Sequence, residues 1–193
     1  MSVDFLIEDN ILKEYLGDGG NVVIPTGVTT IGKFCFIKCD PHQANSVELE
    51  SVQLPDTLVK IEAFAFANCW NLTEIIIPEG VTEIGDHAFE KCQNLEKVIL
   101  PQSLLRIGDY AFSSCIISEL ELPQGVTSIG EGGLMNNRMK EIKLPDNIEN
   151  ISKKAFDGQL YAFFKMHVKK GSVTEKVATQ YSKKSKTEIS LYE

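Results

Sequence analysis

Apolar residues recur along this chain at fixed distances from a series of prolines. Six of the seven prolines are spaced 30, 23, 23, 22 and 22 residues apart, at Pro25, Pro55, Pro78, Pro101, Pro123 and Pro145. Repeats of roughly 20–29 residues are typical of solenoids built from strands and short helices. A single copy cannot bury its own apolar side, so the pattern predicts stacked copies that share one continuous core.

Three columns of apolar residues define this expected core. The first stands three positions after each proline: Val28, Leu58, Val81, Leu104, Val126 and Ile148. The second stands six positions after it: Ile31, Ile61, Ile84, Ile107, Ile129 and Ile151. The third stands eleven positions after it: Phe36, Phe66, Phe89, Phe112, Leu134 and Phe156. Because every member is apolar, each column is expected to stack on itself from copy to copy.

The residues around each proline predict the elements of one copy. Before Pro78, Ile75 and Ile77 are two positions apart, which is the period of a strand with one buried face. Pro78 ends that leading strand and opens a turn, because it has no N–H to donate to a ladder. A short second strand over Val81–Ile84 and a short helical turn that carries Phe89 are expected to follow.

These offsets are similar to those of a known family. From Ile77 to Leu95 the chain reads Ile-Pro-x-Gly-Val-Thr-x-Ile-Gly-x-x-Ala-Phe-x-x-Cys-x-x-Leu. This pattern resembles the BspA-type leucine-rich repeat, also called the Treponema pallidum type, over residues 22–159. The resemblance implies an α/β repeat fold, a right-handed leucine-rich-repeat solenoid without an active site. It also implies kinship with bacterial surface or secreted proteins, some of which take part in adhesion.

The two ends of the chain look like caps of such an array. Residues 1–21 are similar to the hairpin that precedes the first repeat, and residues 160–193 are similar to the strand and helix that close the array. We therefore expect a single structural domain of N-terminal cap, six repeats and C-terminal cap. The glycine-rich segment Gly17–Gly20 precedes a strand, not a helix, so we interpret it as a turn and not as a phosphate loop.

Composition limits the compartment and the class of protein. A chain of 193 residues with 43% hydrophobic residues is long enough for one buried core. No segment approaches the roughly 20 apolar residues of a membrane span, and residues 1–10 lack the features of a signal peptide. As written, the sequence predicts a monomeric cytoplasmic protein, or an exported one whose signal has been trimmed.

The net charge of −8 is unevenly distributed. Residues 153–193 hold nine lysines against four carboxylates, a net charge of +5, which leaves −13 for the remainder. We interpret the basic end as a solvated helical cap. The alternative is binding of nucleic acid or another anionic surface through Lys183, Lys184 and Lys186. Because the acidic body would repel nucleic acid, we expect no binding to duplex DNA at physiological salt.

The cysteines and histidines give no catalytic or metal-binding pattern. Four cysteines stand fourteen positions after a proline, where the last two copies have Asn137 and Gln159; they are Cys39, Cys69, Cys92 and Cys115. A zinc site needs tetrahedral ligands, whereas a periodic line predicts a column of small buried residues, so we expect free thiols and no metal. The histidines, His42, His87 and His167, accompany no catalytic motif. We expect no enzyme activity and no cofactor.

The remaining candidates lie on the surface of the leading strands. Ile76 and Ile99 should point outward side by side, with Glu74 and Lys97 two positions earlier. Repeat proteins commonly bind partners on such a sheet face, so these four residues are the candidate partner-binding patch. The alternative is ordinary β-propensity. Trp70 is a further candidate, either as an exposed interface anchor or as a side chain packed on a neighbouring loop.

Two irregularities interrupt the period. The segment 40–46 is a seven-residue insertion that lengthens the first spacing. The fifth copy loses both the Ala-Phe pair and the cysteine over 131–137, and its adjacent glycines predict local looseness.

The sequence favours a non-catalytic protein-recognition module, with a role in bacterial adhesion or cell-surface contact if the chain is exported. An intracellular scaffold of the same fold is one alternative. Binding of carbohydrate or cell wall is another, and the small number of candidate stacking residues counts against it; they are Phe34, Phe64, Trp70 and Tyr110.

Overall fold

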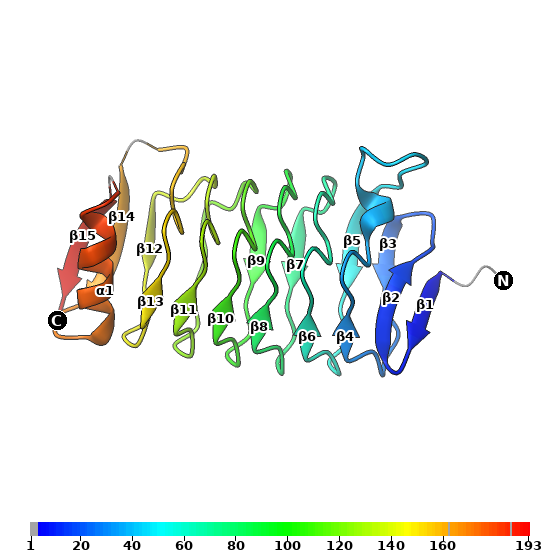
Figure 1. Ribbon diagram of the computed structural model, residues 1–193, viewed down its shortest axis with the longest axis horizontal. Helices are drawn as coiled ribbons and strands as arrows, with labels where there is room; N and C mark the ends of the chain where they lie inside the picture. The colour runs from blue at the N-terminus through cyan, green and yellow to red at the C-terminus, as the bar shows by residue number, and fades with distance from the viewer. Residues whose placement is uncertain (1–3, 162, 186) are drawn as a thin grey trace.

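A computed structural model describes residues 4–161, 163–185 and 187–193 of the protein. These residues form an elongated solenoid whose N- and C-termini lie at opposite ends of the long axis (Figure 1). The architecture is the repeat solenoid of short parallel strands that the spacing of the prolines predicts. We call one copy a rung: a leading strand, its proline, a second strand and the turn that follows.

The second strands form the continuous part of the fold. With an N-terminal hairpin they make one eight-stranded sheet, the main sheet, in the order β1-β2-β4-β6-β8-β10-β11-β13. Its strands are β1 (Phe5–Glu8), β2 (Ile11–Tyr15), β4 (Thr30–Ile31), β6 (Lys60–Ile61), β8 (Glu83–Ile84), β10 (Arg106–Ile107), β11 (Ser128–Ile129) and β13 (Asn150–Ile151). The column of isoleucines is in register, so that Ile107 pairs with Ile84 on one side and Ile129 on the other.

The leading strands are less continuous. They are β3 (Gly20–Val23), β5 (Leu49–Gln53), β7 (Glu74–Ile76), β9 (Lys97–Ile99) and β12 (Glu141–Lys143), followed by β14 (Phe164–Lys169) and β15 (Thr187–Tyr192). They form three separate sheets, β3-β5, β7-β9 and β12-β14-β15. The prediction of a leading strand in every rung is wrong for the fifth, because Ile117–Leu122 forms no strand. Leu120 and Leu122 are nevertheless buried there.

The predicted helical turn is a 3₁₀ helix in the first rung only, at Ile37–Cys39. In later rungs the same segment consists of turns in which an N–H donates to the carbonyl three residues earlier, as from Ala88 to Gly85 (3.2 Å). These turns also bond from rung to rung: the Phe66 N–H donates to the Ala88 carbonyl (2.8 Å). The turns therefore provide a third ladder beside the two sets of strands.

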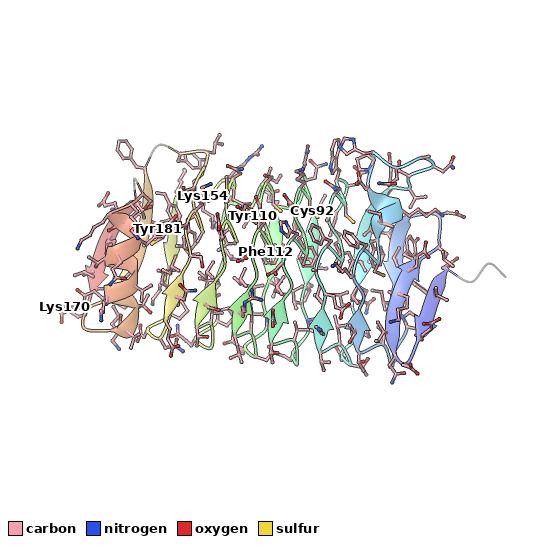
Figure 2. The ribbon with its side chains drawn as sticks, in the orientation of Figure 1. Cys92, Tyr110, Phe112, Lys154, Lys170 and Tyr181 are labelled. Atoms are coloured by element: carbon pink, nitrogen blue, oxygen red, sulfur yellow. The ribbon has the colours of Figure 1, made fainter. Side chains whose placement is uncertain are left out.

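The core follows the three apolar columns. Phe36, Phe66, Phe89 and Phe112 are fully buried, and their rings stack with centroids 4.5, 5.1 and 5.1 Å apart. Figure 2 shows Phe112 inside the solenoid. Leu134 ends this stack in the fifth rung, since it has no ring.

Both ends of the described chain are closed by the elements that the caps predict. At the N-terminus, β1 and β2 pair in antiparallel fashion around a turn at Asp9 and Asn10, both of which have positive φ. At the C-terminus, helix α1 (Val173–Ser182) begins at Ser172, whose hydroxyl accepts the Glu175 N–H. Strand β15 follows α1 and pairs in parallel with β14, which is one strand more than the sequence predicts.

Helix α1, with ten residues, is the longest helix in the described part of the chain, and no described helix could span a membrane.

Candidate functional site

The patch predicted on the leading strands is present as a geometric feature. Strands β7 and β9 pair in register, which places Ile76 beside Ile99 and Glu74 beside Lys97. Ile76 is 53% exposed and Ile99 is 43% exposed. The Lys97 ammonium lies 3.0 Å from the Glu74 carboxylate. We call these four residues the Ile76–Ile99 patch: an apolar pair next to an ion pair on a hydrogen-bonded ribbon.

One backbone hydrogen bond recurs wherever two adjacent leading strands are joined. In a joined pair, the N–H of the residue before the proline donates to the carbonyl of the next rung. The bond forms from Ile24 to Gln53 (3.0 Å), Ile77 to Ile99 (2.9 Å) and Leu144 to His167 (3.0 Å). Among the described residues, the equivalent bonds of Leu54, Leu100 and Leu122 are missing. The segment Ser118–Leu122 is therefore not joined by this bond to either neighbour, although Ile116 donates to the Leu95 carbonyl (3.0 Å) and Arg138 to the Ile117 carbonyl (2.9 Å) just before it.

Two depressions flank the unpaired segment of the fifth rung. A groove of about 880 Å³ lies between Ser118–Leu122 and β12, and we call it the fifth-rung groove. Leu120, Leu122 and Ile142, whose side chains belong to the buried core, line it, and its rim is charged by Glu119, Glu121, Arg138, Lys140, Glu141 and Lys143. A second depression of about 560 Å³ lies between Ser118–Glu119 and β7-β9. The sequence did not indicate either feature.

The turn of the fifth rung keeps its ladder despite the two glycines. The N–H groups of Gly132, Leu134 and Asn136 all donate to carbonyls of the sixth rung. Gly132 has φ of +59°, at a position where every rung has a left-handed residue, so glycine suits it. Looseness was expected at these glycines, but the missing hydrogen bonds lie earlier in the rung, over Ser118–Leu122.

Trp70 is half-buried and packs on the insertion. Its ring meets the His42 ring edge-on, with centroids 5.2 Å apart and planes at 87°. The insertion is anchored by buried Asp40, which accepts from the His42 N–H (2.9 Å) and the Asn68 amide (3.0 Å). This contact favours the packed alternative for Trp70 over the exposed anchor.

A second aromatic column stacks on the turns. Phe34, Phe64, His87 and Tyr110 stand nine positions after their prolines, and their rings stack at 4.8, 4.4 and 5.2 Å. All four residues have φ between +53° and +59°. The ring faces contact one another, which leaves few faces for a sugar. The signal in the sequence was a ring at this offset in four of six copies.

The cysteine column supplies buried hydrogen-bond donors. The Cys92 thiol donates to the Phe66 carbonyl (3.1 Å) and the Cys115 thiol to the Phe89 carbonyl (3.3 Å). In the fifth rung the Asn137 side-chain amide donates to the Phe112 carbonyl (2.8 Å), so an amide can replace the thiol at this position. All five cysteines are free and buried. Burial raises the pKa of the Cys35, Cys69, Cys92 and Cys115 thiols, which keeps them protonated.

The basic C-terminal end uses several of its lysines in contacts. Lys165 pairs with Glu188 (3.3 Å), and Lys169 pairs with Asp146 (3.3 Å). Lys170, at the far end of the molecule in Figure 2, lies 3.8 Å from Glu193. Of the candidate anion-binding lysines, Lys184 lines a cavity of about 420 Å³ between α1 and the sixth rung. Lys186 lies outside the described residues, and the absence of DNA binding stays a prediction.

The stacked parallel strands, buried columns and two caps together define a leucine-rich-repeat solenoid. Within this class, a sequence model of the BspA type leucine rich repeat region matches residues 42–162 in six copies. The chain therefore belongs to the BspA-type leucine-rich-repeat family. A search of curated protein sequences found no match.

Solved structures share the fold. The leucine-rich repeat protein of T. pallidum is 22% identical, with a TM-score of 0.56 over 97% of this chain and 96% of its own. The pneumococcal vaccine antigen PcpA is 17% identical, with a TM-score of 0.58 over 86% of this chain and 65% of its own. At these identities the similarity shows the fold alone.

Proposed function

We propose that this protein is a non-catalytic protein-recognition module that binds a partner protein through the Ile76–Ile99 patch. The observation that carries the proposal is the register of β7 and β9, which places two exposed isoleucines together beside an ion pair. Interface centres combine apolar anchors with a polar rim, and charged pairs at the rim favour the correct orientation. Membership of the leucine-rich-repeat family supports a role in protein interaction.

The proposed biological setting is adhesion or contact at a bacterial surface, in which the partner is a protein of a host or neighbouring cell. PcpA, which shares the fold, is a pneumococcal vaccine antigen. An intracellular scaffold would use the same patch with a different partner. The stacking of Phe34, Phe64, His87 and Tyr110 on one another disfavours the carbohydrate alternative, because sugars stack on open ring faces.

The test is capture of partners from host and neighbouring-cell extracts, followed by cross-linking to locate the contact. Ile76→Asp/Ile99→Asp should lower capture at least about tenfold, since two charges would be buried without partners. The matched control is Val59→Asp/Leu105→Asp, which changes two residues of similar exposure, 52% and 48%, away from the patch. The control variant should capture normally. Equal capture by both variants, with both folded, would remove the patch from the proposal.

A further inference from the structure

The fifth rung has an unpaired backbone on the face of the leading strands. Two series of hydrogen bonds join adjacent leading strands elsewhere: one runs forward, as from Ile77 to Ile99, and one runs back, as from Lys97 to Thr73 (3.3 Å). At the start of the fifth rung, Ile116 donates back to Leu95 (3.0 Å) and Ile117 accepts from Arg138 (2.9 Å), but among the described residues neither series continues over Ser118–Leu122. Ser118, Glu119 and Glu121 are exposed, so these backbone groups meet solvent. Unpaired strand edges of this kind are templates for pairing with another chain.

The direction of the unpaired groups follows from the equivalent residues of joined strands. Ile77 and Leu144 donate forward to the next rung, so the equivalent Leu122 N–H points toward β12. Lys97 and Lys165 donate back to the previous rung, so the equivalent Glu141 N–H points from β12 toward the fifth rung. Among the described strands, β12 pairs with β14 alone. The fifth-rung groove is therefore bordered on both sides by backbone groups that need partners.

We propose that the fifth-rung groove binds an extended peptide segment of a partner protein, which inserts as an additional strand between Ser118–Leu122 and β12. Strand addition of this kind supplies main-chain hydrogen bonds for affinity and alternate side-chain positions for specificity. The groove of about 880 Å³ is within the range of roughly 300–1,000 Å³ that ligand sites occupy. The site is separate from the Ile76–Ile99 patch, so either proposal can fail alone.

The charges and apolar groups around the groove select the sequence of the peptide. An outward side chain of the inserted strand lies between Glu119 and Glu141, and the Glu141 carboxylate also lies 3.1 Å from the His167 ring nitrogen; the two carboxylates favour lysine or arginine. The next outward position lies between Glu121 and Lys143, and a neutral threonine suits this mixed pair. The inward positions meet Leu120, Leu122 and Ile142, so they require apolar side chains such as valine. The segment Lys97–Leu100 of this chain, Lys-Val-Ile-Leu, shows that a leading strand can place lysine outward and apolar residues at both inward positions.

The experiment uses a fluorescein-labelled peptide with the sequence Ser-Lys-Val-Thr-Val-Ser and the whole protein. We expect saturable binding by fluorescence anisotropy with a Kd between about 10 μM and 1 mM. Hydrogen exchange should show unprotected amides at Leu122 and Glu141 in the free protein and slower exchange when the peptide is bound. Replacing both valines with proline removes two donors and should weaken binding at least about tenfold.

Charge reversal separates the proposed contact from a structural effect. Glu119→Lys/Glu141→Lys should lower affinity for the lysine peptide and raise it for the same peptide with glutamate in place of lysine. The control variant, Glu48→Gln/Glu50→Gln, changes two exposed carboxylates at β5 and should bind the lysine peptide normally. Ile76→Asp/Ile99→Asp should also bind the peptide normally, whatever the result of partner capture. The proposal is overturned by equal binding of the proline peptide, by no binding at about 1 mM, or by amides already protected in the free protein.

Discussion

The third and fourth rungs differ from the fifth in backbone pairing on the face of the leading strands. In the former, β7 and β9 are joined by hydrogen bonds and present the Ile76–Ile99 patch. In the fifth, Ser118–Leu122 is unpaired and presents Glu119 and Glu121. The main sheet nevertheless passes through all of them, because Ile107 pairs with Ile129 as it does with Ile84.

This difference shows that the rungs are held by two independent means. The main sheet and the turns carry the backbone ladders, whereas the leading strands can be joined or separate without loss of the stack. A buried side chain replaces part of the missing ladder in the fifth rung: the side-chain amide oxygen of Asn137 accepts the Ile117 N–H (3.0 Å). A leading strand is thus free to vary, which is what a binding face requires.

The largest expected effect is a fall in the free energy of unfolding at alkaline pH. It arises from the rungs that carry a buried thiol, and the fifth rung has none. The pKa of the Cys35, Cys69, Cys92 and Cys115 thiols is raised by burial, so the folded chain keeps protons that the unfolded chain releases above about pH 8.5. The stabilisation is present below that pH and is lost as pH rises. Well above that pH, each thiol lowers the free energy of unfolding by about 1.4 kcal/mol per pH unit, and four thiols together lower it by about 5 kcal/mol per pH unit.

Urea denaturation between pH 7 and 10.5, under reducing conditions, measures this slope. Cys92→Ser should lower it by about one quarter, since a hydroxyl does not titrate in this range. Burial also raises the pKa of Tyr181, whose hydroxyl donates to Asp157 (2.9 Å), so a further loss is expected above about pH 10. A free energy of unfolding that stays constant to pH 10 would contradict the buried thiol column.

The next largest effect is the loss of stability when a buried hydrogen-bond donor is removed from the fifth rung, Asn137, or from the fourth, Cys115. Asn137→Ala removes the donor to the Phe112 carbonyl and the acceptor of the Ile117 N–H, both buried. We expect a loss of about 3 kcal/mol, because two buried polar groups lose their partners. Cys115→Ala removes one thiol bond to Phe89 and should cost about 1 kcal/mol. The loss of stability caused by Asn137→Cys should lie between these two values. Equal costs for Asn137→Ala and Cys115→Ala would show that Asn137 does not compensate for the missing strand.

Much of this comparison could be predicted from the sequence. The apolar columns identified the core, and the alternation at Ile75 and Ile77 identified the register that brings Ile76 to Ile99. The unpaired fifth strand could not be predicted, because Leu120 and Leu122 keep the alternation of a strand while their backbone loses its partners. Strand pairing depends on the distance between the backbones of two rungs, and the sequence of one segment does not determine that distance. The contact of Trp70 with His42 likewise depends on how the insertion folds back.

The smallest expected effect concerns the left-handed residue thirteen positions after the proline in the second to sixth rungs. Lys91 in the third rung and Asn136 in the fifth have φ of +59° and +55°, and the sixth rung has Gly158 there. A left-handed backbone costs most residues about 1–2 kcal/mol, whereas asparagine tolerates it. Glycine avoids this cost but loses about 0.5–1 kcal/mol through chain entropy. Lys91→Gly should therefore stabilise the protein by about 0.5 kcal/mol, and Asn136→Gly should be neutral. Thermal unfolding resolves the difference, and Lys91→Val, which cannot adopt this conformation easily, should be the least stable of the three. A lower stability for Lys91→Gly than for Asn136→Gly would mean that the turns of the regular rungs carry no such strain.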